Sequence, residues 1–319
     1  MTSLLYLIQF NRFIRGSLTF TKAIISKLIT VFGATGQQGG SVIRTILQYE
    51  TLSKEFKVRG ITRDTSKPEA QALLEQGIEL VSADMSSKDS LLKAIQGSHT
   101  VFLVTTPAWG PVGSDSELVH GKNVADVAKE TGETGGRLKH VPHFDQKAHV
   151  EGYILEIGVP AMFVLPVYFM NSYTQIPLLR EGEDGVYTLA YPIGEGARFP
   201  LVDIVRDMGK FVAAALKNRS ETLGTQILSA ADYYTPTRIL AEFEEVTGKK
   251  TRFVQVDSET YKNFMPGLMG EEKLENHLFI ERSGYYGGRS LKESHDLLGK
   301  AGFKTSSWKD FLLEKTSLF

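Results

Sequence analysis

Two side chains able to move protons lie four positions apart in the segment HVPHFDQKAHVEGYI, residues 140–154. The imidazole of His143 has an ordinary pKa of about 6.5, so it can act as an acid or a base at neutral pH. The amine of Lys147 can also take part in proton transfer. Each has a plainer interpretation, His143 as a structural or surface histidine and Lys147 as a cation on a solvated helix face. The chain has no cysteine, which excludes thiolate chemistry, and no metal site is predicted.

A glycine-rich turn, VFGATGQQGGSV, lies between a predicted strand and a predicted helix. Gly33 permits a tight turn, Gly36 lets the backbone approach a pyrophosphate, and Gly39 lets the helix pack close to the strand. The first amides of the helix then face the phosphates, and the helix dipole favours their charge. The pattern predicts dinucleotide binding, and the turn residues predicted to bind the cofactor are Gly33, Thr35, Gly36, Gln37, Gln38 and Gly39.

The end of the second predicted strand, GITRDTSKP, indicates which dinucleotide is bound. Sites for NAD usually carry an acid here, and sites for NADP carry a cation that meets the 2′-phosphate. Arg63 occupies this place and Lys67 follows it, which favours NADP(H). If Asp64 rather than Arg63 faced the ribose, NAD would be preferred.

Other cofactor contacts are predicted from position alone, because ligands of such sheets lie outside the carboxyl ends of the strands. Asp84 and Met85 follow the third strand and are expected to border the adenine. Thr105 and Thr106 end the fourth strand and are expected to line the cofactor.

Short apolar runs alternate with amphipathic segments from Lys27 onward, which is typical of βα units on a parallel sheet. We predict an α/β fold with a Rossmann-type doubly wound sheet and a smaller C-terminal α+β cap. The predicted parts are an N-terminal extension (1–25), a dinucleotide-binding domain (26–166) and a cap or substrate domain (167–319). The segment TQILSA, residues 225–230, is a candidate strand that returns to the main sheet.

The fifth strand of the sheet has no recognisable counterpart in the sequence. Residues 133–142, ETGGRLKHVP, contain no apolar run able to form a buried strand. The strand predicted at 160–166 must then pair directly with the strand at 99–106, or backbone groups inside the sheet remain unpaired.

Overall charge argues against large polyanionic partners. With 36 Lys and Arg against 37 Asp and Glu, the net charge is −1, so neither direct nucleic acid binding nor a membrane partner is expected. The N-terminus departs from this balance, since no acid precedes Glu50 while Arg12 and Arg15 come early. This composition fits either an unstructured extension or a mitochondrial transit peptide. We therefore expect a cytoplasmic or nuclear protein, with a mitochondrial one as the alternative.

Four segments resemble the NmrA-like family, atypical members of the short-chain dehydrogenase/reductase superfamily. They are ITVFGATGQQGGSV (29–42), ITRDTSKPEA (61–70), HVPHFDQKAHVEGYILEIGVP (140–160) and LPVYFMNSY (165–173). The resemblance implies a domain that binds NADP(H), with Lys147 on the nicotinamide ribose and Asn171 near the nicotinamide. His143 and Lys147 keep the spacing of the superfamily's Tyr-x-x-x-Lys pair but lack its tyrosine, while reductase-like relatives are thought to use a lone lysine for proton transfer.

The resemblance implies three alternatives for function. Fungal members of the family act as negative regulators of a GATA-type transcription factor, and an animal relative is regarded as a redox sensor, so we predict a redox-sensing negative regulator of transcription that acts through a protein partner. The second alternative is an NADPH-dependent oxidoreductase of small carbonyl or quinone substrates, with Lys147 as its catalytic residue. Aromatic segments such as VYFMNSY and GYYGG could stack a flat substrate. The third is an inactive isoform that lacks a strand.

Overall fold

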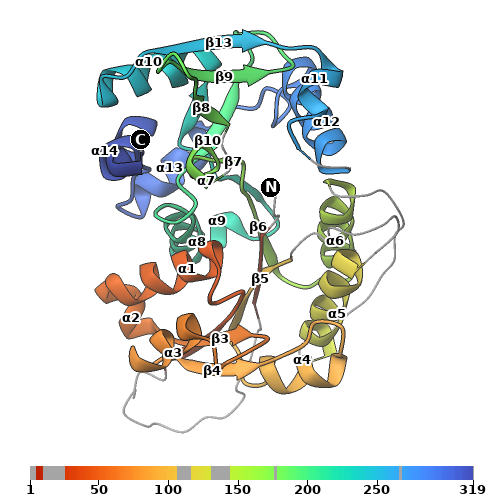
Figure 1. Cartoon of the computed structure of the whole chain (residues 1–319). Helices are drawn as coiled ribbons and strands as arrows, with labels where there is room; N and C mark the ends of the chain where they lie inside the picture. Colours follow the sequence, from red (N-terminus) through yellow and green to blue (C-terminus); the bar gives the residue numbers. More distant parts are fainter. Residues whose placement is uncertain are drawn as a thin grey trace, which may run out of the picture.

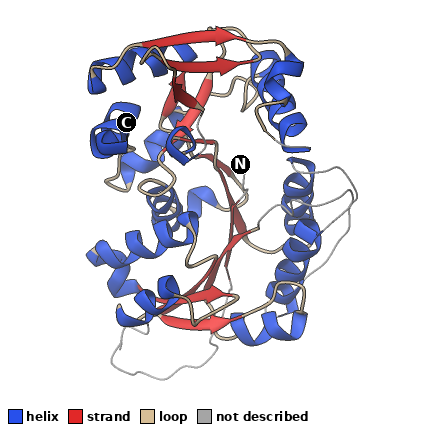
Figure 2. Cartoon of the chain, in the orientation of Figure 1, coloured by secondary structure: helices blue, strands red, loops and turns tan. Residues whose placement is uncertain are grey.

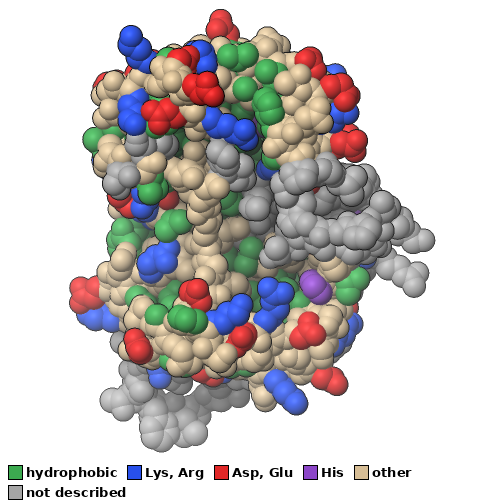
Figure 3. Space-filling model, viewed as in Figure 1, with side chains coloured by type: hydrophobic (Ala, Val, Ile, Leu, Met, Phe, Trp, Pro, Cys, Tyr) green, Lys and Arg blue, Asp and Glu red, His purple; other side chains and the backbone are tan. Residues whose placement is uncertain are grey.

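The structure, a computed structural model, describes residues 5–9, 26–105, 116–130, 144–175, 178–265 and 268–318. A main sheet lies between two layers of helices, and a smaller α/β cap lies at one end (Figures 1 and 2). On the face drawn in Figure 3, basic and acidic side chains are interspersed and form no large patch of one sign. The surface charge is thus mixed on that face, in agreement with the net charge of −1.

The main sheet has seven strands in the order β11-β6-β1-β5-β2-β3-β4. Its strands are β1 (Leu5–Gln9), β2 (Lys27–Phe32), β3 (Phe56–Thr62), β4 (Glu79–Ser82), β5 (Thr100–Val104), β6 (Ala161–Leu165) and β11 (Gln226–Leu228). Strand β2 pairs in parallel with β3 on one side and with β5 on the other. The chain therefore reverses its direction of travel across the sheet at β2, as a doubly wound fold requires.

Helices cover both faces of this sheet (Figure 1). One layer contains α1 (Gln37–Gln48), α2 (Glu50–Glu55), α3 (Pro68–Glu75), α8 (Met208–Lys217), α9 (Arg219–Thr222) and α13 (Lys292–Lys300). The other contains α4 (Lys88–Ile95), α5 (Ser116–Glu130) and α6 (Phe144–Glu156). Consecutive side chains of a strand point to opposite faces of the sheet. In β2, Val31 therefore packs in the core under α1, whereas Phe32 packs in the core under α4 and α5. Burial on both faces explains why these strands read as continuous apolar runs.

Strand β1 occupies the position that a parallel fifth strand would take. It pairs antiparallel with β5, from Leu5 opposite Val104 to Gln9 opposite Thr100, and antiparallel with β6. None of the seven described strands comes from the segment between α5 and α6. The prediction that β5 and β6 either pair directly or leave backbone groups unpaired is therefore wrong, because the N-terminal segment supplies the missing partner for both.

The boundary between sheet and cap is not a single point in the chain. Strand β11 lies in the main sheet, parallel to β6, so the segment 225–230 does return to it. Helix α8 also packs on α1, where the Gly209 amide donates to Ser41 Oγ at 3.0 Å. Several elements after residue 167 thus belong to the layers of the main sheet, and the N-terminal segment 5–9 lies inside it.

The cap is built on two three-stranded sheets, β12-β10-β7 and β13-β9-β8. Its strands are β7 (Tyr168–Phe169), β8 (Leu179–Glu181), β9 (Tyr187–Tyr191), β10 (Phe199–Val202), β12 (Asp232–Tyr234) and β13 (Thr251–Gln255). Its helices are α7 (Ser172–Gln175), α10 (Pro236–Thr247), α11 (Ser258–Lys262), α12 (Leu268–Ser283) and α14 (Trp308–Lys315), followed by a 3₁₀ turn (Thr316–Leu318). Within the described residues, no helix has the length and apolarity needed to cross a bilayer.

A histidine lies in the aromatic core of the cap. His277 is fully buried, and its ring centroid is 4.5 Å from that of Tyr191 and 5.0 Å from that of Tyr261. Its Nδ1 lies 2.7 Å from the carbonyl oxygen of Lys273, so this nitrogen is the donor in the neutral ring. Burial lowers the pKa of His277 to about 4.

Acid is expected to destabilise the cap through His277. The unfolded histidine has a pKa of about 6.5, so between that value and the folded pKa the unfolded state binds more protons and the free energy of unfolding falls as the pH falls. The contribution is fully present above pH 6.5 and its loss reaches roughly 3 kcal/mol near pH 4. Urea unfolding across this range should show a steeper loss for the wild type than for His277→Phe, whereas equal slopes would contradict the assignment.

Candidate functional site

The glycine-rich turn lies between the carboxyl ends of β3 and β5. Gly33 has φ of +64°, which favours glycine, and its carbonyl accepts from the Gly36 amide at 2.9 Å. The Ala34 amide donates to Ile61 at the end of β3. A Cβ atom on Gly33 would come within 2.8 Å of Val104 Cγ1, at the end of β5. The turn therefore lies at the topological switch point, where ligands of such sheets bind.

Gly39 holds α1 close to this turn. A Cβ atom there would lie 2.3 Å from the Gly33 oxygen and 2.9 Å from the Phe32 oxygen. These are backbone atoms that cannot move aside, so the position requires glycine. The first amides of α1, from Gln37 to Gly39, have no acceptor one helical turn earlier and are available to an anion at this end of the helix.

The other residues of the turn leave room and polar groups for a cofactor. Thr35 is exposed, and Gln37 Nε2 donates to Gln175 Oε1 of α7 at 3.3 Å. Gln38 Oε1 is buried and has no hydrogen-bond partner among the described residues. A buried acceptor of this kind ordinarily has a donor, which fits a bound dinucleotide at this turn.

The end of β3 exposes two cations and one carboxylate, on Arg63, Lys67 and Asp64. Asp64 Oδ1 accepts from the Ser66 amide at 2.9 Å and from Ser66 Oγ at 2.6 Å, and these bonds lower the pKa of Asp64. Arg63 and Lys67 are exposed, and within the described chain no hydrogen bond engages the Arg63 guanidinium. The Ser66 bonds occupy only Oδ1 of the Asp64 carboxylate, so which of Arg63 and Asp64 contacts a ribose stays a prediction.

The residues after β4 form a local turn. The Asp84 carboxylate accepts from the Ser86 amide at 2.8 Å and from Ser86 Oγ at 2.7 Å, which lowers the pKa of Asp84. Met85 is partly buried against the core under α4 and α5, and its carbonyl accepts from Asn123 Nδ2 at 3.0 Å. Their contact with an adenine stays a prediction.

Lys147 does not face solvent but forms a buried ion pair. Its Nζ lies 2.5 Å from Glu117 Oε1, and Thr105 Oγ1 donates to the same oxygen at 2.6 Å. The lysine is 4% exposed and the glutamate 1%. Burial lowers the pKa of Lys147, and the Glu117 carboxylate opposes that shift. The amine is therefore already engaged by a carboxylate, which disfavours the solvated-helix interpretation.

The sequence does not predict Glu117 as a site residue. It opens α5, thirty residues before Lys147, and an acidic residue in the first turn of a helix is usually explained by the helix dipole alone. Only the packing of α5 against α6 brings the two side chains together. Of the other predicted site residues, Thr106 and His143 lie outside the described residues.

Asn171 lies at the base of the cap. It lines a cavity of about 320 Å³ with Gln175 of α7, Arg206 and residues of α14. Gln175 is also the partner of Gln37, so α7 connects this cavity to the glycine-rich turn. The contact of Asn171 with a nicotinamide stays a prediction.

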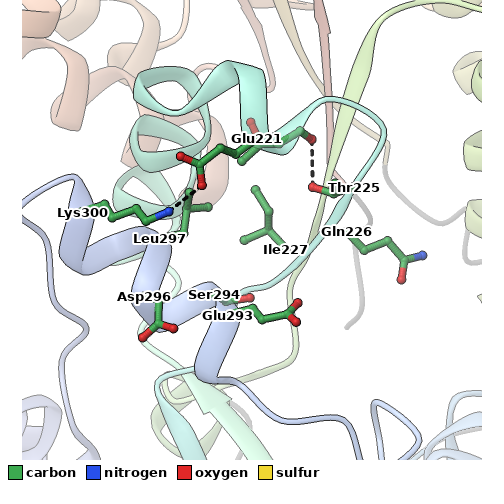
Figure 4. A pocket seen from close by; sticks show the side chains of 10 residues that line it. Glu221, Thr225, Gln226, Ile227, Glu293, Ser294, Asp296, Leu297 and Lys300 are labelled. Atoms are coloured by element: carbon green, nitrogen blue, oxygen red, sulfur yellow. Dashed lines mark hydrogen bonds and ion pairs between the residues drawn. The ribbon is translucent and has the colours of Figure 1, made fainter.

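A separate cavity lies at the outer edge of the main sheet, between β11, α9 and α13 (Figure 4). It measures about 290 Å³ and contains none of the predicted site residues. An ion pair of 2.5 Å between Glu221 and Lys300 crosses it. Among the described residues, no group of three or more metal-ligating side chains is present.

The sequence matches proteins of one family over most of its length. The model of the NmrA-like family matches residues 25–312. The chain is 32% identical over 303 residues to the NmrA-like family domain-containing oxidoreductase ptmS of Penicillium ochrochloron, covering 84% of this chain and 88% of that protein. It is also 32% identical over 260 residues to the oxidoreductase malD of Malbranchea aurantiaca, with 73% and 76% covered.

Solved structures share the fold. NmrA, a negative transcriptional regulator in complex with NADP, aligns with a TM-score of 0.72 at 20% identity over 92% of this chain and 96% of that one. The triphenylmethane reductase of Citrobacter sp. complexed with NADP(H) gives 0.68 at 20% identity, with 90% and 99% covered. The predicted doubly wound α/β fold is confirmed, and the predicted cofactor agrees with these complexes. From the extent of the family match, the chain belongs to the NmrA-like family.

Proposed function

We propose that this protein binds NADP(H) and is an NADPH-dependent oxidoreductase of small carbonyl or quinone substrates. The observation that carries the proposal is the glycine-rich turn at the switch point, with free helix amides on one side and Arg63 on the other. The turn supplies the anion site that a pyrophosphate needs, and Arg63 supplies the charge that a 2′-phosphate needs. The names of the curated relatives, which are oxidoreductases, support the catalytic part.

In this proposal each group has a separate task. The bound cofactor supplies the hydride. The first amides of α1 hold the pyrophosphate, Arg63 and Lys67 hold the 2′-phosphate, and the ammonium of Lys147 donates the proton that the reduced substrate takes up. Glu117 keeps that amine in place at the end of β5. The aromatic residues near Tyr168 and Tyr285 would stack a flat substrate.

A second candidate, a redox-sensing negative regulator that acts through a protein partner, is favoured by one observation. The Lys147 amine is buried in an ion pair, so the described site has no freely accessible acid for turnover. Such a protein would bind NADP(H) without consuming it, and a transcription factor would recognise its cofactor-bound form.

Steady-state oxidation of NADPH with a panel of quinones and carbonyls separates the two candidates. The oxidoreductase proposal expects turnover with at least one acceptor, and it expects Glu117→Gln/Lys147→Met, which removes both charges of the buried pair, to lower kcat more than it changes NADPH affinity. If NADPH binds and every acceptor is left unreduced, the regulator is the better account. Absence of NADPH binding would contradict both.

Replacing Arg63 with alanine is expected to weaken NADPH binding by about tenfold or more, because a charge-assisted contact to the 2′-phosphate is lost. NADH lacks this phosphate, so its affinity should hardly change. Isothermal titration with NADPH and with NADH measures the ratio of the two affinities. Asp64→Asn is the matched control and should leave the ratio of NADPH to NADH affinity unchanged, since Ser66 engages that carboxylate; a large fall in NADH affinity for this control would argue that Asp64, not Arg63, contacts the ribose.

A further inference from the structure

A cavity in the cap, here called the cap cavity, contains none of the predicted site residues. It measures about 380 Å³ and lies between β8, β9 and the residues of α11 and just after it. Its lining is mostly apolar and aromatic, and it includes one charged side chain, Arg180, and one aliphatic hydroxyl, Thr188. Small-molecule sites are concave and mostly apolar, hold a few polar groups and start at roughly 300 Å³. The cap cavity therefore has the size and the lining of a ligand site.

Paired strands form the floor of the cap cavity. Strand β9 turns alternate side chains to opposite faces of its sheet. Leu189 is fully buried in the cap core, whereas its neighbours Thr188 and Ala190 are partly buried and line the cavity. Leu178, just before β8, adds a second aliphatic side chain to the lining. The floor is thus a regular sheet face with partly accessible side chains.

Two aromatic rings form a wall of the cap cavity. The ring centroids of Tyr261 and Phe264 lie 5.8 Å apart in an edge-to-face arrangement. Tyr261 is 1% exposed, so its ring is fixed by packing, whereas Phe264 is 37% exposed. A ligand that covers the Phe264 ring removes apolar surface from water, and a flat ring does so most completely. The wall therefore favours an aromatic ligand.

The two polar groups of the cap cavity are neighbours. Antiparallel pairing places Arg180 directly opposite Thr188, and the Arg180 guanidinium carbon lies 5.7 Å from the Phe264 ring centroid. Thr188 Oγ1 accepts from Arg252 Nε at 2.8 Å, so its own proton is left to donate. A guanidinium beside a hydroxyl donor recognises a carboxylate. No acidic residue lines this cavity in the described chain, which disfavours a cationic ligand.

We infer that the cap cavity binds a small aromatic carboxylate, whose charged group meets Arg180 and Thr188 and whose ring lies against Phe264. The site is independent of the glycine-rich turn, and none of its residues has a task in the proposed NADP(H) site. The inference therefore goes beyond the proposed function and does not rest on it.

Two matched ligands test the inference on the full chain, 2-naphthoate and its neutral counterpart 2-naphthamide, each titrated by ligand-detected NMR. The wild type is expected to bind the carboxylate more tightly than the amide. Arg180→Met keeps the apolar stem of an exposed side chain and should weaken naphthoate binding about tenfold or more, because a charge-assisted contact is lost. The affinity for naphthamide should hardly change.

Two further variants separate direct contact from general effects. Ala190→Leu fills part of the cap cavity and should weaken both ligands. Lys262→Met also removes a positive charge from this part of the cap, but that ammonium lies 2.7 Å from Glu259 Oε1 and does not line the cavity. This variant should bind naphthoate as the wild type does.

Three results would overturn the inference: no binding of naphthoate to the wild type, equal affinities for naphthoate and naphthamide, or an equal loss in Arg180→Met and Lys262→Met. If Arg180→Met failed to fold, as judged by its melting temperature, Thr188→Val would serve instead, with a smaller loss that is again confined to the carboxylate. Titrating NADPH into the same samples keeps the two claims apart, since the cap variants should bind NADPH with unchanged affinity.

Discussion

Gly39→Ala is expected to destabilise the protein by about 2–3 kcal/mol and to weaken NADPH binding severely. The added Cβ atom would lie 2.3 Å from the Gly33 oxygen and 2.7 Å from its carbonyl carbon, so α1 must move away from the turn, and overpacking of this kind has about that cost. The shift also displaces the helix amides from the pyrophosphate position. Urea unfolding and NADPH titration measure the two effects.

The neighbouring glycine offers a matched control. A Cβ atom on Gly40 would lie 3.1 Å from Arg44 Nη1, the end of a flexible side chain, and 3.5 Å from the nearest backbone oxygen. Gly40→Ala should therefore be tolerated and gain up to about 1 kcal/mol from helix propensity. If both alanine variants behaved alike, the close approach of α1 to the turn would not be the reason that position 39 requires glycine.

Removing residues 1–10 is expected to abolish cooperative unfolding. Strand β1 lies inside the main sheet and pairs with β5 and β6, so its loss leaves backbone donors and acceptors of both neighbours unpaired in the core. At about 1–3 kcal/mol for each buried group that stays unpaired, about five such groups already match the roughly 5–15 kcal/mol that stabilises a typical domain. Calorimetry and near-ultraviolet circular dichroism would detect the loss.

A single substitution isolates the backbone contribution of β1. Leu7→Pro removes one amide and breaks the ladder in the middle of the strand, where Leu7 pairs with Phe102 and Met162. Leu7→Ala keeps the amide. The proline variant should be far less stable than the alanine variant, and a truncated chain with an unchanged melting temperature would show that β1 is dispensable to the sheet.

The position of β1 could not be predicted from its own sequence. Residues 5–9 precede the family match, which begins at residue 25, and they belong to a basic N-terminal segment that resembles a leader more than a core strand. Their partners, β5 and β6, lie about a hundred residues and more further along the chain. Pairing over such a distance leaves no local signal, whereas the gap that it fills was visible as a missing apolar run at 133–142.

The glycine-rich turn, unlike β1, can be predicted from its own sequence. Its strand, glycines and helix are consecutive in the sequence, so the spacing of the glycines is enough to predict the turn. The structure adds the backbone contacts that require glycine at position 39. For Arg63 and Asp64, the sequence left open which side chain faces the ribose. The structure adds Ser66, whose amide and hydroxyl donate to one oxygen of the Asp64 carboxylate, a contact that the sequence does not predict. Glu117 required the packing of α5 on α6 and had no distinguishing signal in the sequence.

Thermal unfolding of the purified chain with NADPH, NADP⁺, NADH and no ligand tests the central claim most directly. A ligand present at about 100 times its dissociation constant adds roughly 2.7 kcal/mol to the free energy of unfolding. We expect a cooperative transition that rises with NADPH and NADP⁺, and that rises much less with NADH at the same concentration. A transition that none of the three cofactors shifts would contradict the assignment of the glycine-rich turn and Arg63 as an NADP(H) site.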